Sequence, residues 1–271
     1  MKAIDYRIER VADVAGAIEA LQADPFAKPI AGGQSLGAML NLRLAQPECV
    51  IDIAGLDALK VIRLEDDTMV IGALVTHAAL EDGRYDDATT GMLAHVAAGI
   101  AYRAVRNSGT IGGSLCHADP AADWIAATAA LGATFEVHGA QGPRTVAARD
   151  FMTSAFETVL AEEEVLTTIH IPALGDRARW SYRKFCRKTG EFALAIVSAV
   201  ADPAAGVERL VFSALDGAPV VIERAGLFDE LGAPAAQTAL LDDETLALAG
   251  HRRALHAGLL ADVLADMRGV A

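Results

Sequence analysis

The chain has 271 residues, of which 53% are hydrophobic, and this length predicts two domains because it exceeds what one small core needs. Its 23 basic and 36 acidic residues give a net charge of −13, which argues against a protein that binds the phosphate backbone of nucleic acids. The sequence also has no basic amphipathic helix of the kind that adheres to anionic membranes.

Targeting and redox features predict a cytoplasmic protein. The first twenty residues carry Asp5 and Glu9 and lack the apolar core of a signal peptide, and no run is long enough to span a bilayer. The three cysteines, Cys49, Cys116 and Cys186, lie far apart, so we expect neither a disulfide framework nor a [2Fe–2S] cluster with four cysteine ligands. The seven histidines show no paired metal-ligand spacing, so no metal site is expected.

Residues 1–54 alternate between helix and strand signals and predict a small α/β lobe. Apolar residues at helical spacing predict a helix over 11–22. The segment KPIAGG predicts a short strand that ends in two glycines, and Ser35 is placed as the N-cap of a second helix that ends by Pro47. CVIDI, residues 49–53, predicts a buried strand.

Residues 55–175 predict a larger α+β lobe with a mainly antiparallel sheet. KVIRL and TMVIG predict one hairpin, a second is expected around Gly139–Gly142, and EVLTTIHIP predicts a further strand. Helices are expected after Thr76, over 91–104, and over PAADWIAATAALG, where a proline starts the helix and a glycine stops it.

Residues 176–271 predict a separate C-terminal α+β domain after the connector ALGDRAR. Three strand-like runs, RWSYRKFCR, ALAIVSAVAD and GVERLVFSALDGAPVVIER, predict a three-stranded antiparallel sheet. The tail is expected to be helical, with one apolar face in its last helix.

The segment PIAGGQSLGAML, residues 29–40, has the features of an anion site. A strand that runs into Gly32 and Gly33 and a helix that starts at Ser35 would direct successive backbone N–H groups at one anion. The pattern is neither GxGxxG nor a Walker A loop, which disfavours a nicotinamide Rossmann enzyme and a P-loop nucleotidase. Taken alone, the segment is explained equally well by a tight strand–helix turn without a ligand.

The segment RNSGTIGGSLCHADPAADW, Arg106–Trp124, is the second glycine-rich stretch. We expect Thr110, Gly112, Gly113 and Ser114 to offer backbone N–H groups and two hydroxyls to a ligand. The glycines would allow the backbone to approach a large anionic ligand closely.

Four other residues of this segment are candidates for chemical roles. Asp123, in the first turn of the next helix, would either accept hydrogen bonds from ligand hydroxyls or complement the helix dipole, and Asp119 is expected to be a plain helix cap. Adjacent side chains point apart, so Cys116 and His117 are not expected to form a nucleophilic pair. Cys116 is expected to be a small buried apolar residue, and His117 is a candidate for lining the pocket.

No Ser–His–Asp arrangement, nucleophile elbow or carboxylate pair with catalytic features is evident in the sequence. Two anion-binding loops without acid–base machinery favour a protein that holds a cofactor and lets the cofactor do the chemistry.

Three long segments resemble one known family. AGGQSLGAMLNLRLAQPECVIDI and VRNSGTIGGSLCHADPAAD are similar to the two FAD-binding signatures of the medium, flavin-carrying subunit of molybdenum hydroxylases of the carbon monoxide dehydrogenase and xanthine dehydrogenase type. YRKFCRKTGEFALAIVSA resembles the opening of that family's C-terminal domain, and HRRALHAGLLADVL is a weaker match. The resemblance covers essentially the whole chain in the family's order.

The resemblance implies a fold and a division into domains. Residues 1–175 would form a two-lobed FAD-binding domain of the vanillyl-alcohol-oxidase or PCMH type, with lobes 1–54 and 55–175 that clasp an extended FAD. Residues 176–271 would form a C-terminal α+β domain of the CO-dehydrogenase flavoprotein type, a three-stranded antiparallel sheet with helices.

The resemblance also implies a set of FAD contacts and no catalytic or metal-binding residue in this chain. Ala31 to Leu36 would wrap the pyrophosphate, and Thr110 to Ser114 would form the second wall. Asp123 would bind FAD hydroxyls, and Lys184 would lie near the flavin unless its neighbour Arg183 takes that role. The implied cofactor-binding residues are Pro29, Ile30, Ala31, Gly32, Gly33, Gln34, Ser35, Leu36, Ala101, Thr110, Ile111, Gly112, Gly113, Ser114, His117, Asp123, Leu166 and Lys184.

Two positions depart from the family's usual pattern. Gly37 and Ala38 stand where relatives often have a proline after QSL, which would loosen the start of the helix but leave the phosphate loop intact. Ser114 stands where some relatives have Asn or Asp, which implies a changed contact and not a lost site.

The family implies partners and an electron path. A small subunit would carry two [2Fe–2S] clusters and a large subunit the molybdenum cofactor, in a dimer of heterotrimers. Electrons would pass from the clusters to FAD and then to an external acceptor, which is NAD, a quinone, a cytochrome or oxygen. Two alternatives stay open: a stand-alone FAD-dependent reductase of the same fold, and a nucleotide-binding or regulatory protein without redox function.

Overall fold

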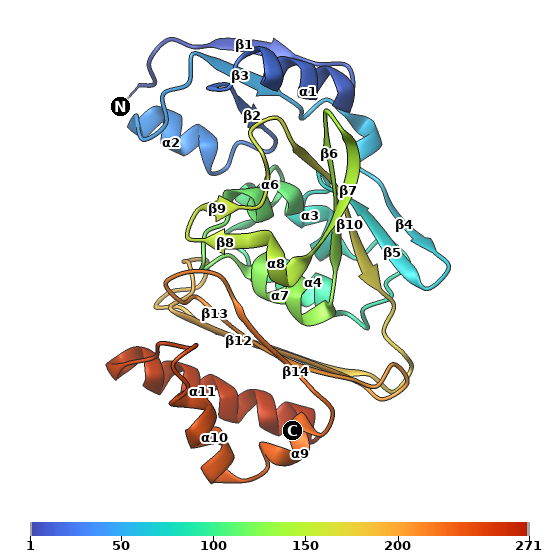
Figure 1. Cartoon of the computed structure of the whole chain (residues 1–271), viewed down its shortest axis with the longest axis vertical. Coiled ribbons are helices and arrows are strands. Elements are labelled where there is room, and N and C mark those ends of the chain that lie inside the picture. Colours follow the sequence, from blue (N-terminus) through green and yellow to red (C-terminus); the bar gives the residue numbers. More distant parts are fainter. Residues whose placement is uncertain (1, 270–271) are drawn as a thin grey trace.

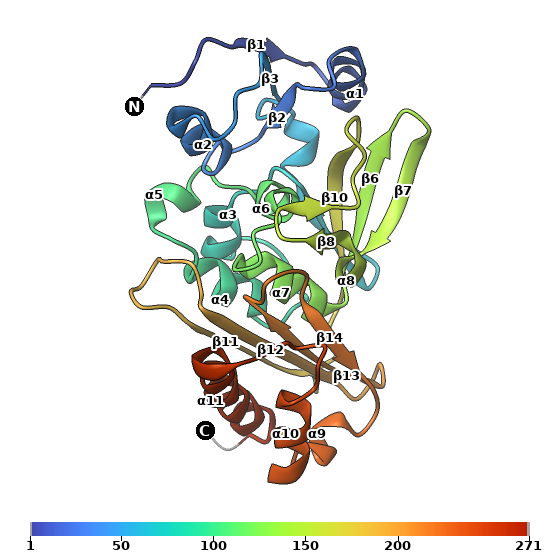
Figure 2. The ribbon, with the colours of Figure 1, turned by 60° about the vertical axis from the view of Figure 1, so that its left-hand side comes forward.

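The computed structural model describes residues 2–269 and stacks three parts along its longest axis in chain order (Figure 1). A small lobe comes first, a larger lobe lies in the middle, and a sheet with helices closes the other end. Figure 2 shows the same stacking from another side. Each part is built around a sheet of its own.

The small lobe is a three-stranded parallel sheet in the order β1–β3–β2, flanked by helices. Helix α1 buries Ala17 and Leu21, and Asp13 caps it by accepting a hydrogen bond from the Gly16 N–H at 2.8 Å. The alternating α/β pattern was predicted, but β1 was not, because RIER is exposed at every position and carries no strand periodicity. The elements are β1 (Arg7–Arg10), α1 (Val14–Ala23), β2 (Lys28–Ile30), α2 (Leu36–Leu42) and β3 (Cys49–Asp52).

The larger lobe contains a five-stranded antiparallel sheet in the order β4–β5–β10–β6–β7, so both hairpins and the antiparallel arrangement predicted from the sequence are present. A two-stranded ribbon, β8–β9, accompanies it. The elements are the 3-10 helix η1 (Asp57–Leu59), β4 (Ile62–Glu65), β5 (Thr68–Gly72), α3 (His77–Asp82), α4 (Met92–Ala98), α5 (Arg103–Arg106), α6 (Ile111–His117), α7 (Asp123–Leu131), β6 (Thr134–Gly139), β7 (Gly142–Ala147), α8 (Ala148–Phe151), β8 (Met152–Ser154), β9 (Glu157–Thr158) and β10 (Val165–Pro172).

Helix α7 is the centre of the molecule. All nine of its residues are buried, because the helix contacts β10 of the middle sheet as well as β12 (Ala195–Asp202) and β13 (Val207–Ser213) of the C-terminal sheet. Gly132, in the left-handed conformation at φ 69°, ends the helix as predicted. The helix begins at Asp123 and not at Pro120, with Ala122 at the cap position.

The C-terminal part has a four-stranded antiparallel sheet in the order β11–β12–β13–β14, so the prediction of three strands was wrong. The third run contains two strands, because the chain turns back at Ala214, which has a positive φ of 58°. All eight residues of β12 are buried because α7 contacts this strand and α11 also packs on it. The elements are β11 (Arg179–Phe185), β12 (Ala195–Asp202), β13 (Val207–Ser213), β14 (Val220–Glu223), α9 (Leu227–Glu230), α10 (Pro234–Leu241) and α11 (Gly250–Met267).

Two helix predictions need correction. The helix expected over 91–104 is two helices, α4 and α5, because the chain breaks between them and Ala101 adopts a positive φ of 41°. The segment 111–117, expected to be a glycine-rich loop, is the short helix α6, capped by the Thr110 side chain. Within residues 2–269, no helix is both long enough and apolar enough to cross a membrane.

Candidate functional site

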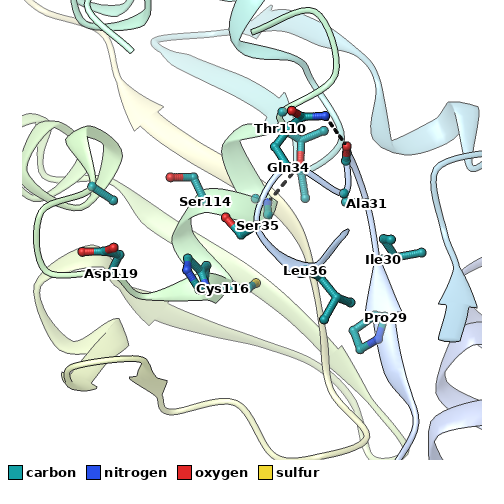
Figure 3. A pocket seen from close by; sticks show the side chains of 18 of the residues that line it. Pro29, Ile30, Ala31, Gln34, Ser35, Leu36, Thr110, Ser114, Cys116 and Asp119 are labelled. Carbon is teal, nitrogen blue, oxygen red and sulfur yellow. Dashed lines mark hydrogen bonds between the residues drawn. The ribbon is translucent and has the colours of Figure 1, made fainter. Parts of the chain in front are cut away.

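A cavity of about 690 Å³ lies where the β2–α2 loop of the small lobe faces α6 of the larger lobe (Figure 3). Its volume is within the range typical of small-molecule and cofactor sites. The β2–α2 loop, α6, the start of α7, the segment before α5 and the β11–β12 connection all contribute to its wall.

The structure brings nearly all of the predicted cofactor-binding residues to this one cavity. Pro29 to Leu36, Ala101, Thr110, Gly112 to Ser114, His117, Asp123 and Leu166 line it. Ile111 and Lys184 do not. Ile111, the first residue of α6, is fully buried, and Lys184 pairs with Asp123, which itself lines the cavity.

The β2–α2 loop presents a row of backbone donors. None of the N–H groups from Ala31 to Leu36 donates to an acceptor within the described part of the chain. Ser35 stands at the cap position of α2, but its hydroxyl makes no capping bond. Gly33 has a positive φ of 67°, a conformation that successive N–H groups need to converge on one point. The loop is therefore equipped to bind an anion.

The second wall is built differently, and the expectation that it offers backbone N–H groups was wrong for Gly112, Gly113 and Ser114. Those of Ile111 and Gly112 donate to Val75 O at 3.0 Å and Ala73 O at 2.9 Å. Gly113 donates to Thr110 Oγ1 at 3.1 Å, and Ser114 donates to Thr110 O at 3.0 Å. This wall presents hydroxyls, chiefly that of Ser114, which has no partner in residues 2–269.

Two of the glycines serve contacts within the protein and not the approach of a ligand. A Cβ on Gly32 would lie 1.9 Å from Ser108 O, and a Cβ on Gly112 would lie 2.5 Å from the Ala73 side chain. The first contact joins the two glycine-rich segments directly. Gly32 therefore sets how closely the small lobe sits on the larger lobe, whereas Gly112 allows a close contact within the larger lobe.

Asp123 is held by two donors from β11, which belongs to the C-terminal sheet. Tyr182 Oη and Lys184 Nζ each donate to Asp123 Oδ1 at 2.7 Å. Oδ2 has no partner among the described residues, and since Asp123 lines the cavity, this oxygen is the one available to a ligand hydroxyl. Burial, together with the neighbouring Asp123 carboxylate, raises the pKa of Tyr182 well above its usual value, so Tyr182 stays a neutral donor.

The alternation of β11 separates the two basic residues that the sequence left as alternatives. Lys184 shares a face with Tyr182 and points toward α7, whereas Arg183 points the other way and binds Asp266 of α11 at 2.7 and 2.8 Å. Lys184 is therefore on the side of β11 that faces Asp123, and Arg183 is on the side that faces α11. Tyr182 was missed by the sequence analysis, although its i, i+2 spacing to Lys184 in a strand was a usable signal.

The turn between α4 and α5 is held by cations on its carbonyl groups. Lys184 Nζ donates to Gly99 O at 2.8 Å, and Arg106 donates to Ile100 O at 2.7 Å and Ala101 O at 3.1 Å. Arg106 is itself fixed by two 2.8 Å hydrogen bonds to Glu81. Ile100 and Ala101 line the cavity, so these pairs position part of its wall.

The remaining candidates of the second segment lie at the cavity with modest roles. His117 lines it and packs against Phe156, with ring centroids 5.3 Å apart. Cys116, expected to be buried, is exposed at the cavity. Asp119 accepts a hydrogen bond from the Ala121 N–H at 2.9 Å and so caps a turn before α7 and not the helix itself. Among residues 2–269, no cluster of three or more His, Cys, Asp or Glu is arranged to hold a metal ion.

Comparison with known proteins assigns this chain to a family. Residues 4–174 match the family model described as the FAD-binding domain in molybdopterin dehydrogenase. The chain belongs to this family. The domain of this family binds FAD, so FAD is the cofactor of this chain. The N–H groups of Ala31 to Leu36, which have no acceptor among the described residues, and Asp123 Oδ2 fit a dinucleotide with phosphates and hydroxyls.

Curated relatives agree with this family across most of the chain. The carbon monoxide dehydrogenase medium chain of Hydrogenophaga pseudoflava is 39% identical over 201 residues, which are 74% of this chain and 70% of the relative. The nicotine 6-hydroxylase medium subunit of Paenarthrobacter nicotinovorans is 35% identical over 224 residues, which are 83% of this chain and 78% of the relative. The chain is thus an oxidoreductase flavoprotein of the molybdenum hydroxylase medium-subunit type.

Solved structures match the fold over the whole chain. Carbon monoxide dehydrogenase from Hydrogenophaga pseudoflava, in a form that lacks the Mo-pyranopterin moiety, superposes with a TM-score of 0.87 at 30% identity and covers 100% of both chains. Quinoline 2-oxidoreductase from Pseudomonas putida 86 superposes with a TM-score of 0.86 at 29% identity and covers 100% of this chain and 99% of that chain. The fold is the mixed helix and strand fold of these flavoprotein subunits.

Proposed function

We propose that this chain is the FAD-carrying electron-transfer subunit of a molybdenum-containing hydroxylase, taking electrons from [2Fe–2S] clusters of a partner and passing them to an external acceptor. The observation that carries the proposal is the cavity in which six successive free N–H groups, Ala31 to Leu36, face a wall that ends at a carboxylate oxygen of Asp123. When bound, FAD supplies the redox chemistry.

The chain's own residues bind and orient the cofactor. The N–H groups of Ala31 to Leu36 hold the pyrophosphate, with the hydroxyls of Ser35 and Ser114 close by (Figure 3). Asp123 Oδ2 accepts hydrogen bonds from FAD hydroxyls. Lys184 does not contact FAD but positions two groups at the cavity: its Nζ donates to Asp123 Oδ1 at 2.7 Å and to Gly99 O at 2.8 Å.

We extend the proposal to the domain division. Residues 1–175 form the two-lobed PCMH-type domain, with lobes 1–54 and 55–175, and residues 176–271 form the C-terminal domain. The change from the β4–β5–β10–β6–β7 sheet to the separate β11–β14 sheet between Pro172 and Arg179 supports this boundary. Because Tyr182 and Lys184 lie beyond it, the C-terminal domain takes part in shaping the FAD cavity.

The partners are those the family uses. The chain has three cysteines, fewer than the four ligands that a [2Fe–2S] cluster usually takes, so its clusters are carried by a small partner subunit. A large subunit carries the molybdenum cofactor and selects the substrate, and the assembly is a dimer of heterotrimers. Medium subunits of carbon monoxide dehydrogenase and nicotine 6-hydroxylase among the relatives support an assembly with partners.

Two measurements test the proposal. Titration of the purified full chain with FAD is expected to give a stoichiometric complex with protein-bound flavin absorbance bands, and a chain that binds no FAD contradicts the cofactor assignment. Purification from the native source is expected to yield a complex that contains iron and molybdenum. A chain that purifies alone and turns over a substrate without either metal would instead be a stand-alone reductase.

A further inference from the structure

His77 lies in the wall of the FAD cavity, and the sequence patterns gave it no role. It is the first residue of α3, it is only 5% exposed, and its side chain borders the cavity. Two hydrogen bonds fix the start of α3. The His77 N–H donates to Gly109 O at 2.9 Å, and Thr76 caps the helix by accepting from the Ala79 N–H at 3.2 Å.

A buried tryptophan fixes which ring nitrogen of His77 carries the proton. Trp124 Nε1 donates to His77 Nδ1 at 3.0 Å. The indole nitrogen is only a donor, so Nδ1 must be the acceptor, and in the neutral ring the proton sits on Nε2. Burial, with a smaller contribution from nearby Arg106, lowers the pKa of His77 to about 4, so the ring is neutral at physiological pH.

The Nε2–H group faces the cavity. This group has no acceptor among residues 2–269. Every fully buried side-chain nitrogen or oxygen of those residues has a hydrogen-bond partner, so Nε2 is not fully buried. Nε2 therefore borders open space, and the space that His77 lines is the FAD cavity.

Close contacts at Gly109 and Gly32 place this donor near the β2–α2 loop. A Cβ on Gly109 would lie 2.9 Å from His77 Nε2, so the ring edge rests on the backbone of Gly109. A Cβ on Gly32 would lie 2.9 Å from Gly109 Cα, so Gly32 packs against the same residue. His77 and Gly32, which belongs to the loop with the N–H groups of Ala31 to Leu36, therefore both pack against Gly109.

We propose that His77 donates a hydrogen bond from Nε2–H to a pyrophosphate oxygen of FAD, as a neutral donor whose tautomer is set by Trp124. The inference rests on the proposed FAD site. A neutral donor here complements the backbone N–H groups of Ala31 to Leu36, which are neutral too, so phosphate recognition is built from oriented dipoles and not from cations.

Two variants separate the donor from the packing of the ring. The side chain of Asn extends only as far as the Nδ1 atom of histidine. In His77→Asn the amide oxygen can still accept from Trp124, but the N–H donor at the position of Nε2 is lost. Gln reaches as far as Nε2, so His77→Gln returns an N–H donor to the cavity. Both are made in the full chain and titrated with FAD, and the melting temperature of each FAD-free protein is measured.

We expect His77→Asn to bind FAD about tenfold more weakly, the effect of one hydrogen bond to a charged group, with a ³¹P shift of the bound pyrophosphate that differs from wild type. His77→Gln is expected to recover most of the affinity and the wild-type ³¹P shift. Wild-type affinity in His77→Asn overturns the inference, and so does an equal loss in both variants with lowered FAD-free melting temperatures. Failure of the wild-type chain to bind FAD contradicts the proposed function instead.

Discussion

Lys184 Nζ lies 2.7 Å from Asp123 Oδ1, and this ion pair joins β11 of the C-terminal sheet to the start of helix α7 at the edge of the cavity. The two residues are 61 positions apart in the sequence and both are largely buried. Tyr182, two residues before Lys184, donates to the same oxygen. The cavity is therefore completed by the C-terminal part of the chain.

Lys184→Met tests how much this pair stabilises the fold. The variant leaves the buried Asp123 carboxylate with Tyr182 as its only protein donor and leaves Gly99 O without its partner. Removal of one member of a buried pair typically costs about 3 kcal/mol, so we expect a loss of that size in the free energy of unfolding, measured with urea.

Lys188→Met is the matched control, because Lys188 lies in the exposed part of the β11–β12 connection and makes no ion pair with another described residue. We expect this variant to stay within about 0.5 kcal/mol of wild type. Equal stability of the two variants would mean that the Asp123–Lys184 pair contributes nothing measurable.

Asp123→Asn separates FAD binding from folding. The amide oxygen of Asn can still accept from Tyr182 and Lys184, but its NH₂ group then replaces Oδ2, the acceptor that faces the cavity. We expect FAD to bind at least tenfold more weakly in a fluorescence titration. Asp150→Asn, at an exposed position of α8, should bind FAD like wild type. A normal FAD affinity in Asp123→Asn would remove Asp123 from the site.

Local patterns in the sequence predicted most elements of the lobes, because hydrophobic periodicity and caps act over a few residues. Thr76 caps α3, Gly132 ends α7, and both hairpins of the middle sheet form where turn residues were seen. The parallel strand β1 was missed, since its four residues are exposed and its pairing with β3 joins positions some forty residues apart.

The break at Ala101 shows what local patterns do not contain. The segment 91–104 is rich in helix-forming residues, yet the chain leaves the helix where Lys184 and Arg106 bind the carbonyl groups of Gly99, Ile100 and Ala101. Lys184 belongs to β11 of the C-terminal sheet, so tertiary contacts impose the break in the helix. No local pattern marks His77 and Glu81 for the same reason, because their partners Trp124 and Arg106 lie far along the chain.

Gly32→Ala tests whether the close contact between the two glycine-rich segments is required. The added Cβ would lie 1.9 Å from Ser108 O and 2.6 Å from Ser108 C, both backbone atoms, so the two segments must move apart. We expect FAD binding to fall below detection and the melting temperature to fall, because the small lobe no longer seats on the larger one.

Gly37→Ala is the control for this substitution. Gly37 lies in α2 and a Cβ there has nothing within 4 Å, so the variant should be more stable than wild type by about 0.5 to 1 kcal/mol and should bind FAD normally. Normal FAD affinity in Gly32→Ala would mean that the loops adapt and that their contact does not shape the site.

Glu81→Gln tests whether the Glu81 carboxylate, by binding Arg106, supports the turn at Ala101, and the readout is how protein stability depends on pH. Hydrogen bonds from Arg106 first, and from Arg103, lower the pKa of Glu81 below its ordinary value of 4.5. A carboxylate with a lowered pKa in the folded state stabilises the protein above its unfolded pKa, and this contribution is lost as the pH falls through the folded value. We expect the variant to be less stable than wild type by about 1 to 2 kcal/mol at pH 7, measured by urea unfolding.

The difference between wild type and Glu81→Gln should shrink as the pH falls below 4.5. Glu81 of the unfolded chain is protonated first, and Glu81 of the folded protein loses its interactions at the lower pH where its own pKa lies. Since Arg106 holds Ile100 O and Ala101 O, a loosened Arg106 also frees a turn that lines the cavity, so FAD affinity should fall in the variant at pH 7. Glu19→Gln, at an exposed position of α1, controls for the loss of a charge alone. A stability gap that stays constant from pH 7 to a pH below the lowered pKa of Glu81 would show that the Glu81 charge does not hold Arg106 in place.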